Sequence, residues 1–203
     1  VVLPDGTIKI FFIRRPDGKK MCSISSGDGG LNWSEVHDEF DLPGAGYHAV
    51  RVLLDRNTNE IVAFFHIFRG DPNGRNYGVD SCYDGWAART IDGRTKWTRP
   101  ECVYKGYLGS IRTIIQLQSG RIVVAFGDEV IGRPAILPCG SGAVTDVYSD
   151  DDGKTWHTSP SRILAPCDPE YNNAGFDGAC EPTLIQLHTG RIWMLMRTQA
   201  NYQ

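Results

Sequence analysis

Two side chains that can do chemistry together flank a predicted β-hairpin near the end of the chain. The segment "CEPTLIQLHTGRIWMLMRT", residues 180–198, turns near Thr189, with Glu181 eight residues before the turn and Arg197 eight residues after it. Antiparallel pairing then places the carboxylate and the guanidinium opposite each other, at the end remote from the turn. Because a planar guanidinium suits a carboxylate, the pair is either a cross-strand salt bridge or part of a binding site.

Further polar residues fall at the same end of their strands by the same counting from turns. Arg51 and Arg112 stand at strand starts before a hairpin turn, and Asp128 follows one. The loop "CDPEYNNAGFDGAC", residues 167–180, leads directly into the hairpin, and its Tyr171 has a ring that can stack on a ligand. These residues are candidates for a binding site, and their alternatives are solvated charges and an ordinary connection.

Hairpin turns recur along the chain and must position these residues. The segments "LPDGTI" from Leu3, "LQSGRI" from Leu117 and "LHTGRI" from Leu187 each place a turn between apolar runs, and flanks such as "EIVAFFHIF" and "RIVVAF" are rich in β-branched and aromatic residues. No stretch shows sustained helical periodicity with caps. The sequence therefore predicts an all-β fold.

A second motif, SxDxGxxW, alternates with these turns. It occurs as "SGDGGLNW" at 26–33 and "SDDDGKTW" at 149–156, and "TIDGRTKW" at 90–97 is a degraded copy whose Gly stands one place earlier. The motif predicts a hairpin turn, because the Asp accepts backbone N–H bonds, the Gly supplies positive φ and the Trp covers the turn. The residues with this structural role are Ser26, Asp28, Gly30, Trp33, Asp92, Trp97, Ser149, Asp151, Gly153 and Trp156.

The acids of "SDDDGKTW" do not have the spacing of a metal site. An EF-type loop with its glycine at Gly153 would need a ligand where Tyr148 stands and a Glu where Ser159 stands. A catalytic role for these acids is also disfavoured, because a motif that recurs in several repeats more often has a structural role in each repeat than a role in one active site.

Two turn signals that alternate about every 50 to 70 residues are typical of four-stranded sheets repeated around an axis, the β-propeller. The division that fits them is an incomplete first blade at 1–44, two complete blades at 45–107 and 108–168, and a fourth that stops within the blade at 169–203. Four blades are too few to close a ring, so we expect the remainder of the propeller on a longer chain or on a second one.

Composition excludes several classes of protein. The 203 residues are 41% hydrophobic and carry a formal charge of -3, with no run of Lys or Arg that would favour nucleic acid. No apolar stretch approaches 20 residues, and the start lacks the pattern of a signal peptide. The six cysteines have no zinc-ligand spacing and are either buried thiols or one or two bridges. The sequon Asn32-Trp33-Ser34 favours a secreted or extracytoplasmic protein but leaves the compartment open.

The quoted motifs resemble those of one known family. SxDxGxxW resembles the Asp-box (BNR repeat) of the sialidases, or neuraminidases, and the segment 180–198 resembles the sialidase stretch in which an "NE" pair precedes a hairpin ending in "NMR" or "NAR". "AVRVLLDRNTNEIVAFF" and "IRTIIQLQSGRIVVAF" resemble the second and third sialidase blades. The resemblance spans essentially the whole chain and implies a six-bladed β-propeller, of which this chain covers roughly four blades.

The resemblance also implies a chemistry. Sialidases are retaining exo-glycosidases that need no metal or cofactor, and they use a Tyr nucleophile because the carboxylate of sialic acid would repel a carboxylate nucleophile. Glu181 corresponds to the base that activates this Tyr, and Arg197 to the second of three arginines that clamp the substrate carboxylate. Arg15, Arg51, Arg112, Asp128 and Tyr171 are further candidates to contact a sugar.

Other family residues fall outside or at the margins of the chain. The first clamp arginine would lie upstream of Val1, and the third arginine and the nucleophilic Tyr beyond Gln203. The acid/base Asp should follow the second strand of the first blade, where "IKIFFIRRPDGKK" offers Arg15 and Asp17, although Asp17 also fits a plain PDG turn. Cys180-Glu181-Pro182 replaces the usual Asn-Glu-Ser or Asn-Glu-Cys, which leaves the identity of the acidic sugar open.

The first functional hypothesis is therefore a sialidase-like glycosidase that removes a terminal sialic acid, or a related acidic sugar, from a glycan or sialoglycoconjugate. One alternative is a non-catalytic Asp-box propeller that binds glycan or protein. Another is a hydrolase or lyase on the same fold that acts on a different acidic sugar.

Overall fold

The computed structural model describes residues 1–16, 18–46, 50–71, 81–129, 142–164 and 179–198. All regular structure in these ranges is β-strand, so the prediction of an all-β fold is confirmed. Within the same ranges no helix is long and apolar enough to cross a membrane.

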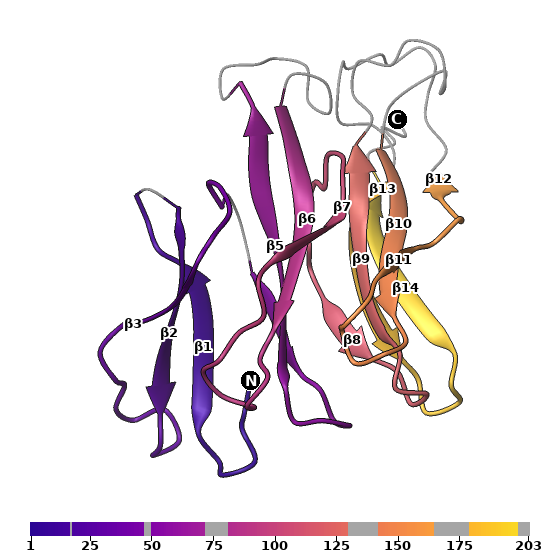
Figure 1. The fold of residues 1–203 in the computed structure, drawn as a ribbon. Coiled ribbons are helices and arrows are strands. Elements are labelled where there is room, and N and C mark those ends of the chain that lie inside the picture. Colours follow the sequence, from indigo (N-terminus) through magenta and orange to yellow (C-terminus); the bar gives the residue numbers. More distant parts are fainter. Residues whose placement is uncertain (17, 47–49, 72–80, 130–141, 165–178, 199–203) are drawn as a thin grey trace.

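Four antiparallel sheets follow one another along the chain (Figure 1). The first has the order β1 (Ile8–Ile13), β2 (Lys20–Ser26) and β3 (His37–Asp41). The second has the order β4 (Arg51–Leu54), β5 (Ile61–Gly70), β6 (Ser81–Arg89) and β7 (Glu101–Tyr104). The third has β8 (Ile114–Gln116), β9 (Ile122–Glu129), β10 (Gly142–Ser149) and β11 (His157–Thr158), with β12 (Ile163–Leu164) also paired to β10. The fourth has β13 (Ala179–Gln186) and β14 (Ile192–Thr198).

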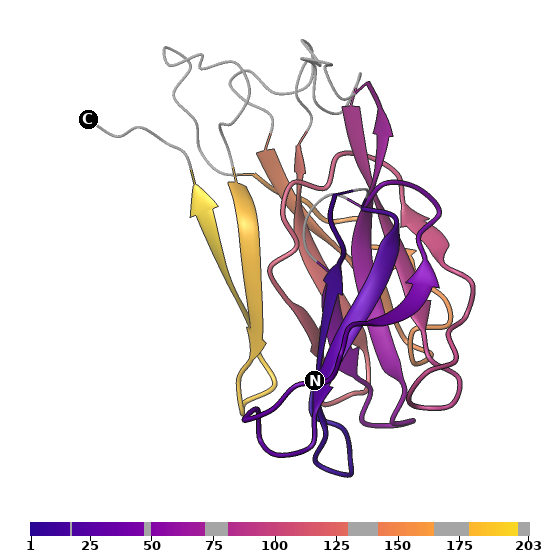
Figure 2. The same cartoon turned by 90° about the vertical axis from the view of Figure 1, so that its left-hand side faces the viewer.

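The sheets pack side by side, in the order in which they occur along the chain (Figures 1 and 2). The first strands of the later sheets are neighbours, since β4 lies against β8 and β8 against β13. We call the end at which β5, β9 and β14 finish the upper rim, and the opposite end the lower rim. The division of the chain into propeller blades, and their total number, stays a prediction.

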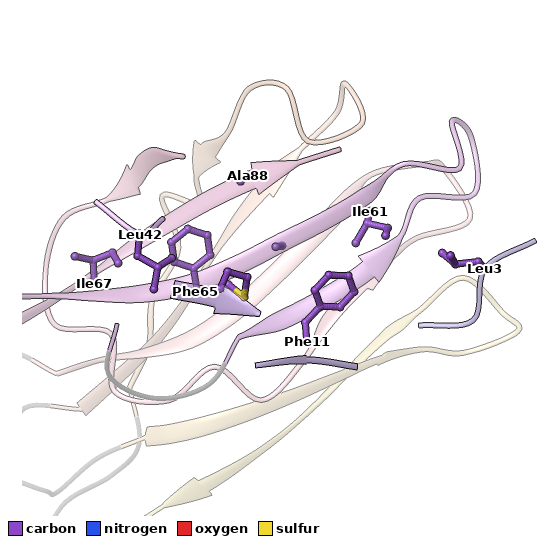
Figure 3. Close-up of a cluster of buried hydrophobic side chains, with 9 residues drawn as sticks. Leu3, Phe11, Leu42, Ile61, Phe65, Ile67 and Ala88 are labelled. Carbon is purple, nitrogen blue, oxygen red and sulfur yellow. The ribbon is translucent and has the colours of Figure 1, made fainter. Parts of the chain in front are cut away.

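Apolar side chains fill the spaces between neighbouring sheets. Phe11 and Phe65 belong to the cluster between the first and second sheets (Figure 3), and Phe64 and Phe126 to the cluster between the second and third. Because neighbouring residues of a strand point to opposite faces, β5 serves both clusters. Leu184 joins the third sheet to the fourth. Each such buried side chain contributes roughly 1.5–3 kcal/mol, so the sheets hold their relative positions by packing.

Tight turns at the lower rim set the register of the two hairpins nearest the candidate site. Gly120 has φ 95° and Gly190 has φ 84°, and in both turns the glycine N–H donates to the carbonyl of the Leu three residues earlier at 2.9 Å. Glycine suits these positions because a side chain disfavours positive φ. The second turn pairs Gln186 with Ile192 and so centres the hairpin on Thr189.

The two complete SxDxGxxW segments form closely similar turns at the lower rim, between β2 and β3 and between β10 and β11. The N–H groups of Gly30 and Gly153 each donate to the motif serine Oγ at 2.9 Å. Asp28 and Asp151 each accept, through Oδ1, the N–H four residues ahead at 2.9 and 2.8 Å. These carboxylates are therefore occupied by their own turns, at the end of the molecule opposite Glu181.

The degraded copy between β6 and β7 also uses its acid within the turn. Asp92 Oδ1 accepts the N–H groups of Arg94, Thr95 and Lys96 at 3.0, 2.8 and 2.9 Å. The indole of Trp97 donates to Glu39 Oε2 at 2.8 Å and so ties this turn to the first sheet.

Candidate active site

Four residues singled out in the sequence come together at the upper rim. Arg51 begins β4, Arg112 precedes β8, Glu181 lies in β13 and Arg197 lies near the end of β14. Since β4, β8 and β13 are neighbours, three successive sheets contribute to one cluster. We call these four residues the rim cluster.

The carboxylate of Glu181 lies between two guanidinium groups. Its Oε2 is 2.9 Å from Arg112 Nη2, and its Oε1 accepts a hydrogen bond from Arg197 Nη2 at 3.2 Å. The Glu181 side chain is 30% exposed, and those of Arg112 and Arg197 are 45% and 51% exposed. Because a guanidinium has five N–H donors, Arg112 has donors to spare for an anion that arrives from solvent.

Arg51 lies beside Arg112 and adds a third cation to the rim cluster. Its Nε donates to the Arg112 carbonyl at 2.8 Å, and its Nη1 donates to the Val50 carbonyl at 3.0 Å. Burial, together with the positive charge of Arg112, lowers the pKa of Arg51. Three guanidinium groups against one carboxylate leave the rim cluster with excess positive charge, which suits an anionic ligand.

The backbone at Glu181 departs from a regular strand. Arg197 pairs with Cys180, and the register then shifts before Thr183 pairs with Leu195. Glu181 lies in this bulge with φ 52°, a left-handed conformation that is costly for a residue with a side chain. The predicted contact between the Glu181 carboxylate and the Arg197 guanidinium is confirmed, although the bulge shifts the backbone pairing by one residue, to Cys180.

The neighbouring sheet approaches the bulge closely at Gly127 of β9. A Cβ on Gly127 would lie 3.4 Å from the Cα of Cys180 and 3.8 Å from the N of Glu181. A Cβ at these distances would make ordinary van der Waals contact, so β9 and β13 are closely packed where the bulge occurs.

Asp128, the fifth candidate at this rim, is held by other residues. Its side chain is 7% exposed, and Oδ2 lies 2.5 Å from Arg162 Nη1. Burial, and then the charge and hydrogen bond of Asp128, raise the pKa of Tyr104 well above its ordinary value. As a direct ligand of a sugar hydroxyl Asp128 is poorly placed, and Arg162, which the sequence did not single out, is the exposed member of the pair.

The remaining candidates cannot be joined to the rim cluster. Arg15 is exposed between β1 and β2. Asp17 and Tyr171 lie outside the described residues, so the acid/base role and the stacking role stay predictions. Across the described ranges no three His, Cys, Asp or Glu side chains gather as metal ligands would.

Comparisons with known proteins bear on this arrangement. No protein-family model matches the chain. A curated sialidase from Micromonospora viridifaciens is 26% identical to it over 227 residues, which cover 98% of this chain and 32% of the relative. The solved structure of the Hadza microbial sialidase Hz136 superimposes with a TM-score of 0.66 at 15% identity, over 98% of this chain and 41% of that one. This chain is sialidase-like in sequence and in fold.

A second solved structure widens the comparison. A protein of unknown function from Dyadobacter fermentans superimposes with a TM-score of 0.70 at 18% identity, over 98% of this chain and 60% of that one. The sialidase-like chain therefore spans about a third of the length of the curated relative and less than two thirds of either structure. Its sheets correspond to part of a larger fold in each case.

Proposed function

We propose that this sialidase-like protein is an exo-glycosidase that removes a terminal sialic acid, or a related acidic sugar, from glycans. The observation that carries the proposal is the rim cluster, in which one carboxylate, Glu181, lies between two half-exposed guanidinium groups with a third beside them. Excess positive charge at an exposed rim matches a substrate that carries a carboxylate on the carbon to be attacked.

The ion pairs of Glu181 suggest how such a substrate is received. Arg112 and Arg197 each contact Glu181 through one Nη2 group, and Arg112 keeps other donors. A substrate carboxylate that binds these donors competes with Glu181 for both guanidinium groups. Binding would then loosen at least one ion pair and leave a Glu181 oxygen able to accept a proton.

That proton would come from the nucleophile. Under the sialidase resemblance, a Tyr attacks the anomeric carbon and Glu181 takes the phenolic proton, so that a sugar–Tyr bond forms as the bond to the leaving oxygen breaks. Water then cleaves the sugar–Tyr bond with retention of configuration. The strained backbone at Glu181 supports a functional role, because such conformations persist mainly where the surrounding structure imposes them.

Hydrolysis of a fluorogenic sialoside tests the proposal. We expect turnover by the protein, a fall in kcat of about 100- to 10,000-fold in Glu181→Gln through loss of the base, and a raised KM in Arg197→Lys through loss of the planar fork. Arg121→Lys is the matched control, since Arg121 pairs with Asp150 at the lower rim at 2.6 Å and should leave both constants unchanged. A folded protein with no turnover, or variants that match the wild type, would contradict the proposal.

A further inference from the structure

A second pair of arginines stands at the upper rim, outside the rim cluster, and each is supported by a buried aspartate. Arg69, near the end of β5, contacts Asp84 of β6 through two hydrogen bonds, Nε to Oδ2 at 2.8 Å and Nη2 to Oδ1 at 3.1 Å. Arg162, between β11 and β12, contacts Asp128 through Nη1 at 2.5 Å. The rim cluster uses none of these four residues.

The two ion pairs meet at one glycine. The Gly106 N–H donates to Asp84 Oδ1 at 3.0 Å, and a Cβ on Gly106 would lie 3.4 Å from Asp128 Oδ1. Asp84 and Asp128 therefore flank the same residue from the second and the third sheet. The two ion pairs thus adjoin the seam between these sheets.

Exposure within each pair is strongly asymmetric. Both aspartate side chains are 7% exposed, whereas those of Arg69 and Arg162 are 56% and 48% exposed. Such a pair contributes little to stability, since water screens the half-exposed guanidinium and only the anion is buried. The aspartates instead fix the guanidinium groups in orientation, which lowers the entropy that an anion must overcome on binding.

Unused donors remain on each guanidinium. Arg69 gives two of its five N–H groups to Asp84 and also contacts the Cys82 side chain, which leaves it further donors. Arg162 contacts Asp128 through Nη1 and also contacts the Tyr104 side chain, which leaves it further donors among its five N–H groups. Planar donor edges of this kind recognise the oxygens of a carboxylate or a sulfate.

We propose that Arg69 and Arg162, each oriented by a buried aspartate, form a second anion-binding subsite at the upper rim that takes a carboxylate or sulfate on a sugar beyond the one that is cleaved. This inference rests on the proposed function for the place of the cleaved sugar. The two sites are near each other along β9, since Asp128 follows Gly127, on which a Cβ would lie 3.4 Å from the Cα of Cys180 at the bulge. The preferred substrate is then a glycan that carries two acidic groups.

Binding of a small anion tests the subsite without any turnover. Inorganic sulfate and glucuronate are titrated separately into ¹⁵N-labelled protein, and the side-chain Nε–H signals of Arg69 and Arg162 are followed, with Arg69→Lys and Arg162→Lys used for assignment. We expect both signals to move with one affinity. In the double Arg→Gln variant, which lacks these signals, titration calorimetry should give an affinity at least tenfold weaker. The anion that binds with the higher affinity, sulfate or glucuronate, identifies the acidic group that the subsite prefers.

Kinetics then connect the subsite to substrate choice. For the Arg69→Gln/Arg162→Gln variant we expect KM to rise about tenfold for a doubly acidic substrate, disialyllactose or sulfated sialyllactose, and to stay unchanged for sialyllactose. The control is Arg94→Gln, because Arg94 is 61% exposed and pairs with Asp5 at the lower rim. Thermal unfolding shows whether the protein stays folded when the buried aspartates lose their arginine partners. If the Gln variant is unfolded, the corresponding Lys variant is used in its place.

The two proposals fail separately. Anion-induced shifts at Arg69 and Arg162 without sialoside turnover would overturn the proposed function and support the subsite. Signals that do not move, or an equal rise in KM for singly and doubly acidic substrates, would overturn the subsite while the proposed function stands.

Discussion

At the scale of single residues, Glu181 and Arg112 make the contact that most defines the candidate site. They lie 69 positions apart and meet at 2.9 Å between two different sheets, with both side chains partly exposed. A partly exposed ion pair contributes little to stability, since two long side chains lose entropy and water screens the charges. The pair is therefore better explained by ligand binding than by folding.

The first prediction concerns Arg112. In Arg112→Gln the substrate carboxylate loses one charge-assisted contact, worth about 1.5–3 kcal/mol, so we expect kcat/KM for a sialoside to fall about 10- to 100-fold. The melting temperature should change little. Steady-state kinetics together with thermal unfolding check this, and a large loss of stability with unchanged kcat/KM would show that Arg112 is structural.

The sequence could predict some of these contacts and not others. Counting residues from the turn at Thr189 predicted that Glu181 lies near Arg197, because a turn fixes the register of the two strands that it joins. The same counting could not predict the contact between Arg112 and Glu181, since contacts between sheets depend on how the sheets pack. Pro182 was an available signal for the bulge, because a proline cannot donate to a strand ladder. Asp84, a charge within an apolar strand, was a similar signal for a buried ion pair.

At the scale of elements, the turns at the lower rim hold the hairpins whose other ends build the site. In the turn between β2 and β3, hydrogen bonds from Asn32, first of all its N–H, lower the pKa of Asp28 to about 2. These bonds are made to the ionised carboxylate and weaken when it is protonated. The turn between β2 and β3 should thus be sensitive to acid.

The second prediction follows from the sign of this shift. A lowered pKa means that the stabilisation is fully present above the ordinary value near 3.8 and is lost as the pH falls through about 2. We expect wild type to melt above Asp28→Asn at pH 6, and the difference to shrink between pH 4 and pH 2. Melting temperatures of both proteins across this range give the answer, and a difference independent of pH would mean that Asp28 acts without its charge.

At the scale of the whole molecule, the fourth sheet has one covered and one uncovered face. Leu184 and Met194 pack toward β9. On the other face Ile185, Trp193 and Leu195 are 56%, 69% and 75% exposed. Contiguous apolar side chains of this size on a sheet normally contact another surface, and a further sheet of a longer chain, or a second chain, fits this face.

The third prediction tests this face. The polypeptide of residues 1–203 should self-associate through it, and Trp193→Ser with Leu195→Ser should shift the distribution toward monomer in sedimentation velocity. Leu31→Ser is the control, because Leu31 is 84% exposed but stands alone in a turn. Equal association of all three proteins would contradict a role for this face.

The central claim is that the rim cluster recognises a carboxylate on a sugar. Titration calorimetry with 2,3-didehydro-N-acetylneuraminic acid and with its methyl ester tests this claim most directly, because the two ligands differ in that one charge. The account predicts that the ester binds about 10- to 100-fold more weakly to the wild type, and that the difference largely disappears in Arg112→Gln/Arg197→Gln. Equal affinity of acid and ester for the wild type would contradict it.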